Sequence, residues 1–329
     1  MRLVSYLGDE DGGTGLLVGD RVIPLFDGFL AGLDLDPDSL DDFRRRAATL
    51  HGATGIPLDE VELVAPIPFP GKIVCVGQNY SDHVAEQKGE VRPRPLLFSK
   101  FANAVIGDEE PIVRPEGCHA LDLEVELAVV IGTTANRVAR EDALDHVAGY
   151  LVVNDISARD WQGVPVALAE GQIGDGQWLR AKGSDTFLPM GSVLVTADEI
   201  PDPQDLRLRS YRIPGSGPDD GGRMLMQEGT TADMIWSVAE LIAFISRSIT
   251  LDPGDVIATG TPSGVGVFRD PPVYLVPGDR VRCEIDGIGW VENPVIDWSD
   301  VDDDDDDDHD DREDPSLDPD DLDELVGGR

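Results

Sequence analysis

Two glutamates, Glu124 and Glu126, stand two residues apart inside the apolar run Leu121–Ile131, which has the composition of a buried β-strand. Residues two apart on a strand share a face, so both carboxylates would point into a region where an unpaired charge is costly. A third acid, Asp155, follows a second apolar run, Val147–Asn154. Three converging carboxylates without clustered His or Cys favour a hard divalent cation such as Mg²⁺, Mn²⁺ or Ca²⁺.

Basic residues further along the chain could contact a ligand or neutralise these acids. Arg159 and Gln162, one helical turn apart, offer a guanidinium and an amide suited to a ligand carboxylate, although Arg159 could instead pair with Asp160 on the surface. Lys182 is one of only four lysines, and its ammonium could neutralise a developing enolate. Lys100 raises the same question, with a structural salt bridge as the alternative. An ion-paired core cluster built on Arg159 or Lys182 is the alternative to a metal.

A possible catalytic base lies in the segment Asn79–Glu86. His83 and Glu86 are three residues apart, so on a helical turn the carboxylate could orient the imidazole and raise its basicity. Alone, such a pair is more often a surface contact. The Gly-rich segment 258–266 could bring backbone N–H groups and the Thr261 hydroxyl to a ligand, but it matches no nucleotide-binding motif.

Composition narrows the class of protein. The net charge is −39 at pH 7, with 65 acidic against 26 basic residues, and Asp302–Asp308 is a run of seven aspartates. Abundant carboxylates with scarce lysine predict adaptation to molar salt, an ordinary acidic cytosolic protein being the alternative. The absence of a basic stripe argues against nucleic-acid binding.

The sequence predicts a cytoplasmic protein. Three cysteines without CxxC spacing suggest reduced thiols rather than a disulfide framework or a zinc site. No apolar signal core is visible at the amino terminus, and the longest apolar helical stretch is interrupted by polar residues, so no membrane association is expected.

The predicted fold class is α+β and mainly β, without the βαβα alternation of a doubly wound sheet. Residues 1–65 predict a small α+β domain, 66–71 a Pro-rich connector, 72–298 the catalytic domain, and 299–329 a disordered acidic tail. In the first domain the sequence predicts short strands near Arg2–Leu7, Gly15–Val18 and Arg21–Pro24, a helix over Ser39–Leu50, and a turn at Gly13-Thr14-Gly15.

Turn residues and periodicity predict several elements of the larger domain. Asp252–Asp255 and Val276–Asp279 have the composition of turns that feed strands, and Asp286-Gly287 is a hairpin signal. One long helix is expected over Ala232–Ile249, capped by Thr230 or Thr231.

Taken in order, these motifs resemble the fumarylacetoacetate hydrolase family, and in particular its acylpyruvase and 2-hydroxyhepta-2,4-diene-1,7-dioate isomerase-like branch. The likeness runs from about Gly71 to Pro294. Each motif alone is weak, but their order and spacing are specific. The segments that carry the resemblance are Gly77-Gln78-Asn79-Tyr80 with His83 and Glu86, Glu124–Gly132, Asn154–Asp160, and Gly229–Gly266.

The resemblance implies a mixed β-roll catalytic domain, a homodimer, and a site holding Mg²⁺ or Mn²⁺, with Ca²⁺ suited to the same ligands. It implies that the metal ligands are Glu124, Glu126 and Asp155. It implies a base dyad of His83 and Glu86, a catalytic Lys182, and contacts to a 2-oxo-acid substrate from Arg159, Gln162, Thr261 and Tyr80.

The leading hypothesis is a metal-dependent hydrolase that cleaves a carbon–carbon bond in acylpyruvate-type 2,4-dioxo acids, releasing a pyruvate enolate. The alternative is an isomerase, hydratase or decarboxylase of related oxo-diacids, acting in aromatic catabolism or on oxaloacetate. A non-catalytic binding protein is disfavoured because the acidic trio and the dyad are both complete. A scaffold acting through its acidic tail is the remaining alternative.

Overall fold

The computed structural model describes residues 1–7, 12–50, 55–168, 176–215 and 222–301. Most of the predicted acidic tail, residues 302–329, lies outside the described residues, as does most of the long turn between Ile213 and Gly222. The described part is strand-rich and of mixed α+β class, which confirms the predicted fold class.

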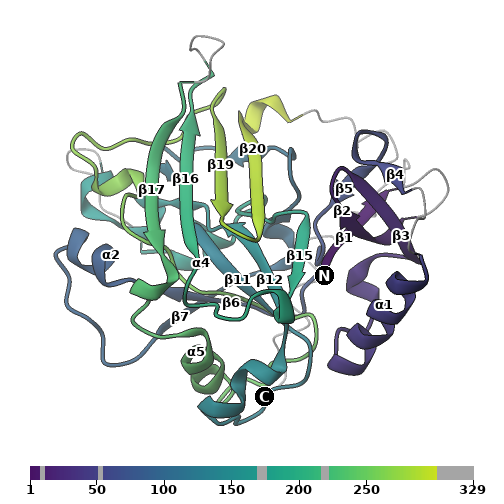
Figure 1. Ribbon diagram of the computed structural model, residues 1–329. Coiled ribbons are helices and arrows are strands. Elements are labelled where there is room, and N and C mark those ends of the chain that lie inside the picture. The colour runs from purple at the N-terminus through teal and green to yellow at the C-terminus, as the bar shows by residue number, and fades with distance from the viewer. Residues whose placement is uncertain (8–11, 51–54, 169–175, 216–221, 302–329) are drawn as a thin grey trace, which may run out of the picture.

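Eleven of the described strands form one large sheet (Figure 1). Its order is β4-β3-β2-β1-β15-β12-β11-β18-β6-β7, with β5 paired to β1; only β18 and β6 are parallel neighbours. The pairing of β1 with β15 joins the amino-terminal strands to the larger domain, whose boundaries stay a prediction. The strands are β1 (Arg2–Leu7), β2 (Gly13–Val18), β3 (Arg21–Asp27), β4 (Ile56–Pro57), β5 (Glu62–Val64), β6 (Ile73–Gly77), β7 (Leu96–Lys100), β11 (Val125–Ile131), β12 (Val147–Asn154), β15 (Val193–Thr196) and β18 (Val256–Ala258).

A second sheet, in the order β17-β16-β19-β20-β9, lies over the first, and β16, β19 and β20 contact β11 and β12 (Figure 1). Two short ribbons, β10 with β13 and β8 with β14, complete the described strands. The second sheet comprises β9 (Ile112–Arg114), β16 (Arg207–Ile213), β17 (Met224–Thr230), β19 (Arg280–Ile285) and β20 (Gly289–Asp297); the ribbons are β8 (Val105–Ile106), β10 (Leu121–Asp122), β13 (Ser157–Ala158) and β14 (Leu188–Pro189).

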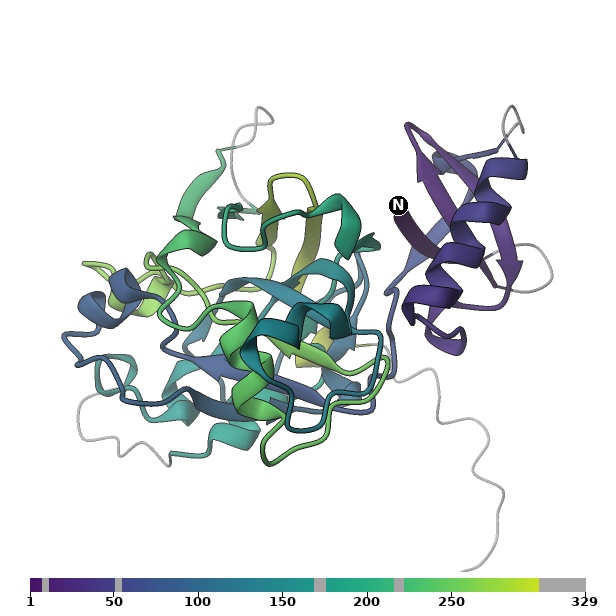
Figure 2. The same cartoon turned by 60° about the horizontal axis from the view of Figure 1, so that its bottom comes forward.

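The helices are short and lie outside the sheets. Figure 2 shows α1 lying across one face of the amino-terminal strands. Several of the predicted site residues lie on α2, α3 and α4. The helices are α1 (Pro37–Thr49), α2 (Ser81–Glu86), α3 (Arg159–Gln162), α4 (Trp178–Gly183) and α5 (Val238–Ile245).

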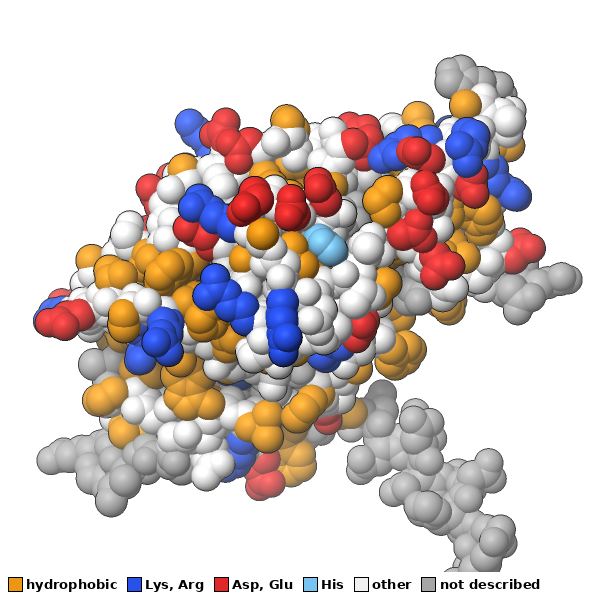
Figure 3. All heavy atoms as spheres, turned by 90° about the horizontal axis from the view of Figure 1, so that it is seen from below, with side chains coloured by type: hydrophobic (Ala, Val, Ile, Leu, Met, Phe, Trp, Pro, Cys, Tyr) orange, Lys and Arg blue, Asp and Glu red, His pale blue; other side chains and the backbone are white. Residues whose placement is uncertain are grey.

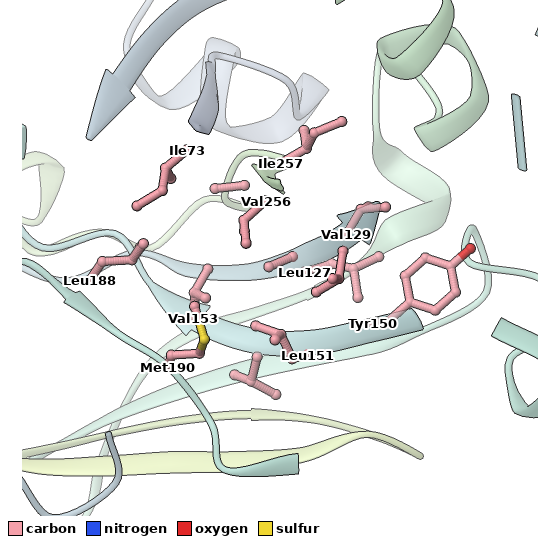
Figure 4. Close-up of a cluster of buried hydrophobic side chains, with 14 of the residues drawn as sticks. Ile73, Leu127, Val129, Tyr150, Leu151, Val153, Leu188, Met190, Val256 and Ile257 are labelled. Atoms are coloured by element: carbon pink, nitrogen blue, oxygen red, sulfur yellow. The ribbon is translucent and has the colours of Figure 1, made fainter. Parts of the chain in front are cut away.

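The core lies around β11 and β12, where every residue of both strands is buried. A strand covered on both faces is apolar throughout, which is why these two runs lack the alternation of a half-exposed strand. Figure 4 shows their side chains packed with those of neighbouring strands, including Leu127, Val129, Leu151, Val153 and Val256.

Both predicted Asp-rich turns and the hairpin are confirmed. The Asp255 carboxylate accepts a hydrogen bond from the backbone N–H of Asp252 at 2.7 Å, and that of Asp279 accepts one from Val276 at 3.0 Å. In each turn the side chain of the last residue thus fixes the backbone of the first. Strand β18 directly follows the first turn, and β19 directly follows the second. Asp286-Gly287 joins β19 to β20 as expected.

The predicted turn at Gly13-Thr14-Gly15 is wrong, because these residues begin β2 and pair with β1. A side chain would not fit at either glycine: an added Cβ would lie 2.6 Å from the Tyr6 ring at Gly13 and 2.3 Å from Val22 at Gly15. The glycines therefore permit close packing within a strand.

The helix predicted over Ala232–Ile249 forms only over Val238–Ile245, so both ends of the prediction are wrong. After a short 3₁₀ turn the backbone is held away from α-helix by Asn79, whose carbonyl oxygen accepts from Ile235 N–H at 2.6 Å. The Asn79 side-chain oxygen accepts from Trp236 N–H at 2.8 Å. These bonds to a distant residue replace the hydrogen bonds that would continue a helix.

Helix α5 therefore begins only after Ser237. The Ser237 hydroxyl accepts from the backbone N–H of Glu240, and the Glu240 carboxylate accepts from the backbone N–H of Ser237, which is a complete capping box. The predicted caps, Thr230 or Thr231, precede a different element; Thr230 accepts only from Ala232 N–H at 3.3 Å, in the 3₁₀ turn.

We expect Ser237→Ala to lower the free energy of unfolding by about 1 kcal/mol, because the helix loses a side-chain acceptor for an unpaired backbone N–H. Thr230→Ala, the matched control at the cap predicted from the sequence, should cost clearly less. Urea denaturation of both variants under one metal condition measures the difference. Equal losses would contradict the start of α5 at Val238.

Candidate active site

The two apolar runs carry the three acids. The run Leu121–Ile131 is split into β10 and β11, so the single strand predicted there is wrong: Glu124 lies in the break and only Glu126 lies within a strand. The second run forms β12 as predicted. The backbone N–H of Asp155 donates to the Glu124 carbonyl oxygen at 2.9 Å, which fixes the end of β12 beside the break.

The carboxylates of Glu124, Glu126 and Asp155 nevertheless converge. One oxygen from each lies within 4.8 Å of the other two, and all three residues are buried. This is a cluster of hard oxygen donors from three directions, which suits a divalent cation. Their role as metal ligands stays a prediction.

Buried cations surround two of these acids. Glu124 accepts from Arg159 at 2.6 Å and from Lys182 at 2.7 Å. Asp155 accepts from Lys182 at 2.8 Å, and its other oxygen lies 2.8 Å from the Lys100 ammonium. Lys182 therefore bridges two members of the trio, and the ion pairing that the sequence allowed as an alternative is present.

Glu126 differs from the other two acids. Among the described residues no Lys or Arg pairs with it, and its carboxylate accepts from the backbone N–H of Gly260 at 2.7 Å. Burial, and then repulsion from Asp155 and Glu124, raises the pKa of Glu126 well above its ordinary value.

The pKa values of Glu124 and Lys182 are shifted in the directions that favour their charged forms. Burial alone would raise the pKa of Glu124, but attraction from Lys182 and Arg159 outweighs it and lowers that pKa. Burial likewise works against the charged form of Lys182, yet Asp155 and Glu124 raise its pKa. The cluster thus holds ionised pairs beside one carboxyl that favours its neutral form.

These observations fit a divalent cation. The site combines three buried oxygen donors with one carboxyl that lacks a cationic side-chain partner, and a divalent ion would favour the ionised form of that carboxyl. Ion pairing with Lys182 and a cation site are therefore compatible, because the lysine leaves Glu126 unpaired.

The segment Thr259–Gly266 forms one wall of the site. Gly260 has φ +96° and an added Cβ would lie 2.8 Å from Asn79 Cβ, so its backbone conformation and its packing against Asn79 require glycine. Thr261 lines the cavity, as predicted for a substrate contact, but its hydroxyl already donates to the Val125 carbonyl oxygen at 2.8 Å. Its predicted role remains untested.

The predicted dyad is formed on α2. His83 is buried, and its Nδ1 lies 3.2 Å from a Glu86 carboxylate oxygen. An ionised carboxylate can only accept, so Nδ1 carries the proton and Nε2 keeps its lone pair. The side-chain amide nitrogen of Gln87 lies 2.6 Å from Nε2 and donates to that lone pair.

A cavity of roughly 370 Å³ brings the predicted groups together. The predicted site residues that line it are His83, Glu124, Glu126, Arg159, Gln162, Lys182 and Thr261. Arg159 Nη1 donates to the Gln162 side-chain oxygen at 3.2 Å, so the surface pair with Asp160 is not the arrangement found. Phe98, Trp178 and Phe268 add apolar walls.

Three predicted site residues lie behind the cavity wall rather than on it. Asp155 and Glu86 act on groups that do line it, Lys182 and His83. Tyr80 is fully buried, and its hydroxyl has no hydrogen-bond partner among the described residues. Burial, and then the Glu126 charge, raises its pKa well above the ordinary value.

Sequence reasoning missed several positioning residues. Asp122 accepts from Arg159 Nε at 2.9 Å and from the backbone N–H groups of Gly266 and Val267, which ties the guanidinium to the Gly-rich segment. Its position two residues before Glu124, in the same acid-rich run, was a signal that could have found it.

A second missed group is Gln227 on β17. Its amide donates to the Thr261 hydroxyl at 2.6 Å and its oxygen accepts from Val125 N–H at 3.0 Å, so one buried side chain holds the break and the Gly-rich segment together. Nothing in its local sequence distinguishes it. Gln78, which lines the cavity with φ +56°, was likewise not singled out as a site residue.

Comparison with known proteins places the chain in a family. A family model described as fumarylacetoacetate (FAA) hydrolase C-terminal matches residues 72–296. The chain belongs to the fumarylacetoacetate hydrolase family, as the sequence motifs had suggested.

Curated relatives narrow the comparison. A mitochondrial oxaloacetate tautomerase of Xenopus laevis is 47% identical over 236 residues, covering 72% of this chain and 69% of the relative. A mitochondrial oxaloacetate tautomerase of Homo sapiens is 44% identical over 241 residues, covering 73% of this chain and 71% of the relative.

Solved structures share the fold over most of the chain. The 2-hydroxyhepta-2,4-diene-1,7-dioate isomerase of Mycobacterium marinum is 32% identical with a TM-score of 0.68, covering 91% of this chain and 99% of that chain. A fumarylacetoacetate hydrolase of Exiguobacterium antarcticum is 34% identical with a TM-score of 0.68, covering 90% and 99%. Members of this family are enzymes, and divalent metals are general among them.

Across the described residues, no helix combines the length and the apolar character that crossing a bilayer requires.

We expect metal binding to release protons. Because the pKa of Glu126 is raised, the metal-free folded protein retains this proton above the ordinary glutamate pKa, and a cation must displace it. Apparent affinity for Mg²⁺ or Mn²⁺ should therefore rise with pH through this window. Over the same window the metal-free protein should lose stability as pH rises, since its folded state binds more protons than its unfolded state.

Calorimetric titration in two buffers of different ionisation enthalpy measures the released protons. Glu126→Gln should bind the metal more weakly and lose this proton release. Binding by the parent protein with no proton release would contradict a protonated Glu126.

Proposed function

We propose that the protein is an isomerase that interconverts the keto and enol forms of a small 2-oxo dicarboxylic acid. The observation that carries the proposal is that a histidine with a defined proton-accepting nitrogen, His83, lines one cavity with the cation Lys182. The oxaloacetate tautomerases and the diene-dioate isomerase among the relatives support it, since both activities concern such acids.

The cavity offers two kinds of contact for a dicarboxylate. Arg159 and Gln162 are held side by side and can bind one carboxylate through parallel N–H donors. Asp122 fixes the guanidinium from behind, so little conformational entropy is lost on binding. The apolar side chains Phe98 and Trp178 pack edge to face at 5.5 Å and limit the space for water.

The proton transfer uses His83. Its Nε2 takes a proton from the carbon next to the 2-oxo group; the electron pair of that C–H bond forms the carbon–carbon double bond, and the carbonyl π pair moves to oxygen. The Lys182 ammonium stabilises the negative charge that develops on this oxygen. Return of the proton to oxygen completes the enol, and the reverse sequence gives the keto form. Glu86 holds the imidazole in the required tautomer throughout.

Gln87 must leave Nε2 before the base can act. Its amide occupies the lone pair at 2.6 Å, so substrate binding must displace it or move the imidazole. Before substrate binds, the Gln87 amide provides a replaceable hydrogen-bond partner for the buried Nε2, which would otherwise lack one.

Mg²⁺ or Mn²⁺ would be held by Glu124, Glu126 and Asp155 and would supply Lewis acidity to the site. The hydrolysis of acylpyruvates that the sequence favours is the weaker hypothesis, because the relatives at 44% and 47% identity are tautomerases. The homodimer, the cytoplasmic location, the role in aromatic catabolism and the adaptation to salt remain predictions.

The reaction is tested with three substrates in parallel: enol-oxaloacetate, a 2-hydroxy-diene-dioate and an acylpyruvate, each with and without Mg²⁺. We expect the ultraviolet absorbance of an enol to decay faster with enzyme, without release of a carboxylic acid fragment. Cleavage of the acylpyruvate with a higher kcat/KM than either isomerisation would overturn the proposal in favour of hydrolysis.

We expect His83→Ala to lower kcat/KM by about 10²–10⁴-fold, because the variant lacks the base that moves the proton. Metal binding should persist, since His83 is not among the three acids. His146→Ala is the matched control: this histidine is half-buried on the 3₁₀ helix η4 (Arg140–His146), and its Nδ1 lies 3.1 Å from the Thr133 carbonyl oxygen. A fully active His83→Ala enzyme would exclude the dyad as the base.

A further inference from the structure

A second cavity, of roughly 340 Å³, lies at α5 and is lined in part by Trp236, whose backbone N–H binds Asn79. Arginines from three segments line it: Arg94 before β7, Arg140 at the start of η4, and Arg247 just after α5. Figure 3 views the molecule from below, the side on which α5 lies in Figure 1, and shows Lys and Arg side chains gathered near the middle of that face.

The three arginines bring positive charge together in a chain whose net charge is −39. Among the described residues neither Arg94 nor Arg247 has an acidic partner, and both are exposed. Arg140 lies 3.3 Å from Glu240, whose carboxylate also caps α5. The cavity therefore carries an excess of positive charge that the protein leaves unneutralised.

The walls indicate the chemistry of the ligand. Two guanidiniums that lack an acidic partner in the described part of the chain match carboxylates through paired N–H donors. Trp236 and Phe244 add apolar surface, which favours an organic anion over an inorganic one. Glu240 on the same face disfavours a compact, highly charged phosphate and is better tolerated by carboxylates spaced along a carbon chain.

The cavity is connected to the active site by hydrogen bonds. Arg92, two residues before Arg94, donates to the Gln78 side chain at 2.7 Å. Gln78 donates to Gln87 at 2.7 Å, and Gln87 contacts His83 Nε2. The chain of polar contacts therefore ends on the nitrogen that acts as the base.

A second connection runs through the backbone. Trp236 N–H donates to the side chain of Asn79, and the Trp236 carbonyl oxygen accepts from the same side chain at 3.0 Å. Asn79 is the direct neighbour of Gln78 and also donates to the Thr259 carbonyl oxygen at 2.7 Å. A ligand that contacts Trp236 would therefore touch the residue that binds Asn79. Asn79 in turn is joined to Gln78 through the backbone and to the Gly-rich segment through Thr259.

We propose that this cavity is a regulatory site for a small organic di- or tricarboxylate, and that its occupancy is transmitted to His83 through Arg92, Gln78 and Gln87. Binding at the arginines shifts the 92–95 segment, and with it the contact between Gln87 and the imidazole. Ligand binding at this cavity does not depend on the proposed reaction, whereas the effect on His83 rests on the proposed function.

Binding is tested by calorimetric titration of the full chain with propane-1,2,3-tricarboxylate at constant ionic strength. We expect saturable one-to-one binding, weakened roughly ten-fold or more in the double variant Arg94→Gln/Arg247→Gln, which loses charge-assisted hydrogen bonds. Arg207→Gln removes one exposed positive charge from β16 and serves as the control that should bind normally.

Three outcomes would overturn the site. Unchanged affinity in the double variant would place the ligand elsewhere, and equal weakening in Arg207→Gln would reduce the effect to general electrostatics. Tighter binding of inorganic phosphate than of the tricarboxylate would contradict the ligand class.

Transmission is tested by kcat/KM with saturating tricarboxylate. We expect a change of about five-fold or more in the parent enzyme, no change in the double variant, and loss of the effect in Arg92→Gln although that variant still binds. A full effect in Arg92→Gln would overturn the pathway. Calorimetric binding with no effect on a measurable activity would overturn the regulation, whereas absence of isomerase activity itself would count against the proposed function.

Discussion

The structure depends on keeping three carboxylates buried next to one another at the ends of β11 and β12. Charges there are costly to desolvate, and the protein offsets them with buried cations: Arg159 and Lys182 on Glu124, Lys182 and Lys100 beside Asp155. The three cations come from helices α3 and α4 and from the end of β7, so those elements are fixed by electrostatics as well as by packing. Lys100 itself is held by the carbonyl oxygens of Ile156 at 3.1 Å and Phe187 at 2.7 Å.

The compensation of buried charge is incomplete at one carboxylate, and the proposed metal chemistry depends on it. Glu126 has a backbone donor but no cationic side chain among the described residues, and it prefers to be neutral. A divalent ion would remove this preference, and metal binding would then be linked to proton release and to the stability of the site. The same surroundings raise the pKa of Lys182 and favour its charged form beside the cavity, where the proposed reaction would use it. In that proposal one cluster both fixes the surrounding elements and prepares the reaction.

The sequence predicted the residues that carry charge better than the residues that hold them. Glu124, Glu126 and Asp155 stood out because acids in apolar runs are rare, and His83 with Glu86 because helical spacing makes them neighbours. Gln227 and Asn79 could not be found this way, since their roles depend on partners far away in the chain: Gln227 joins Val125 to Thr261, and Asn79 binds Trp236. The same long-range contacts explain the wrong start of α5. Local periodicity cannot anticipate that Asn79 takes the N–H groups of Ile235 and Trp236.

The dyad alone does not separate isomerisation from hydrolysis, because an imidazole held by Glu86 can remove a proton from carbon or from water. The difference lies in what else the cavity supplies. Hydrolysis requires a water placed opposite the scissile carbonyl for attack, whereas isomerisation requires only that one proton acceptor reach both carbon and oxygen. Here Nε2 is held by a side chain of the protein, Gln87, which is linked through Gln78 to the surface. A base whose partner is a side-chain amide suits a reaction in which the substrate itself displaces that partner, and this supports the proposal of proton transfer within one bound molecule.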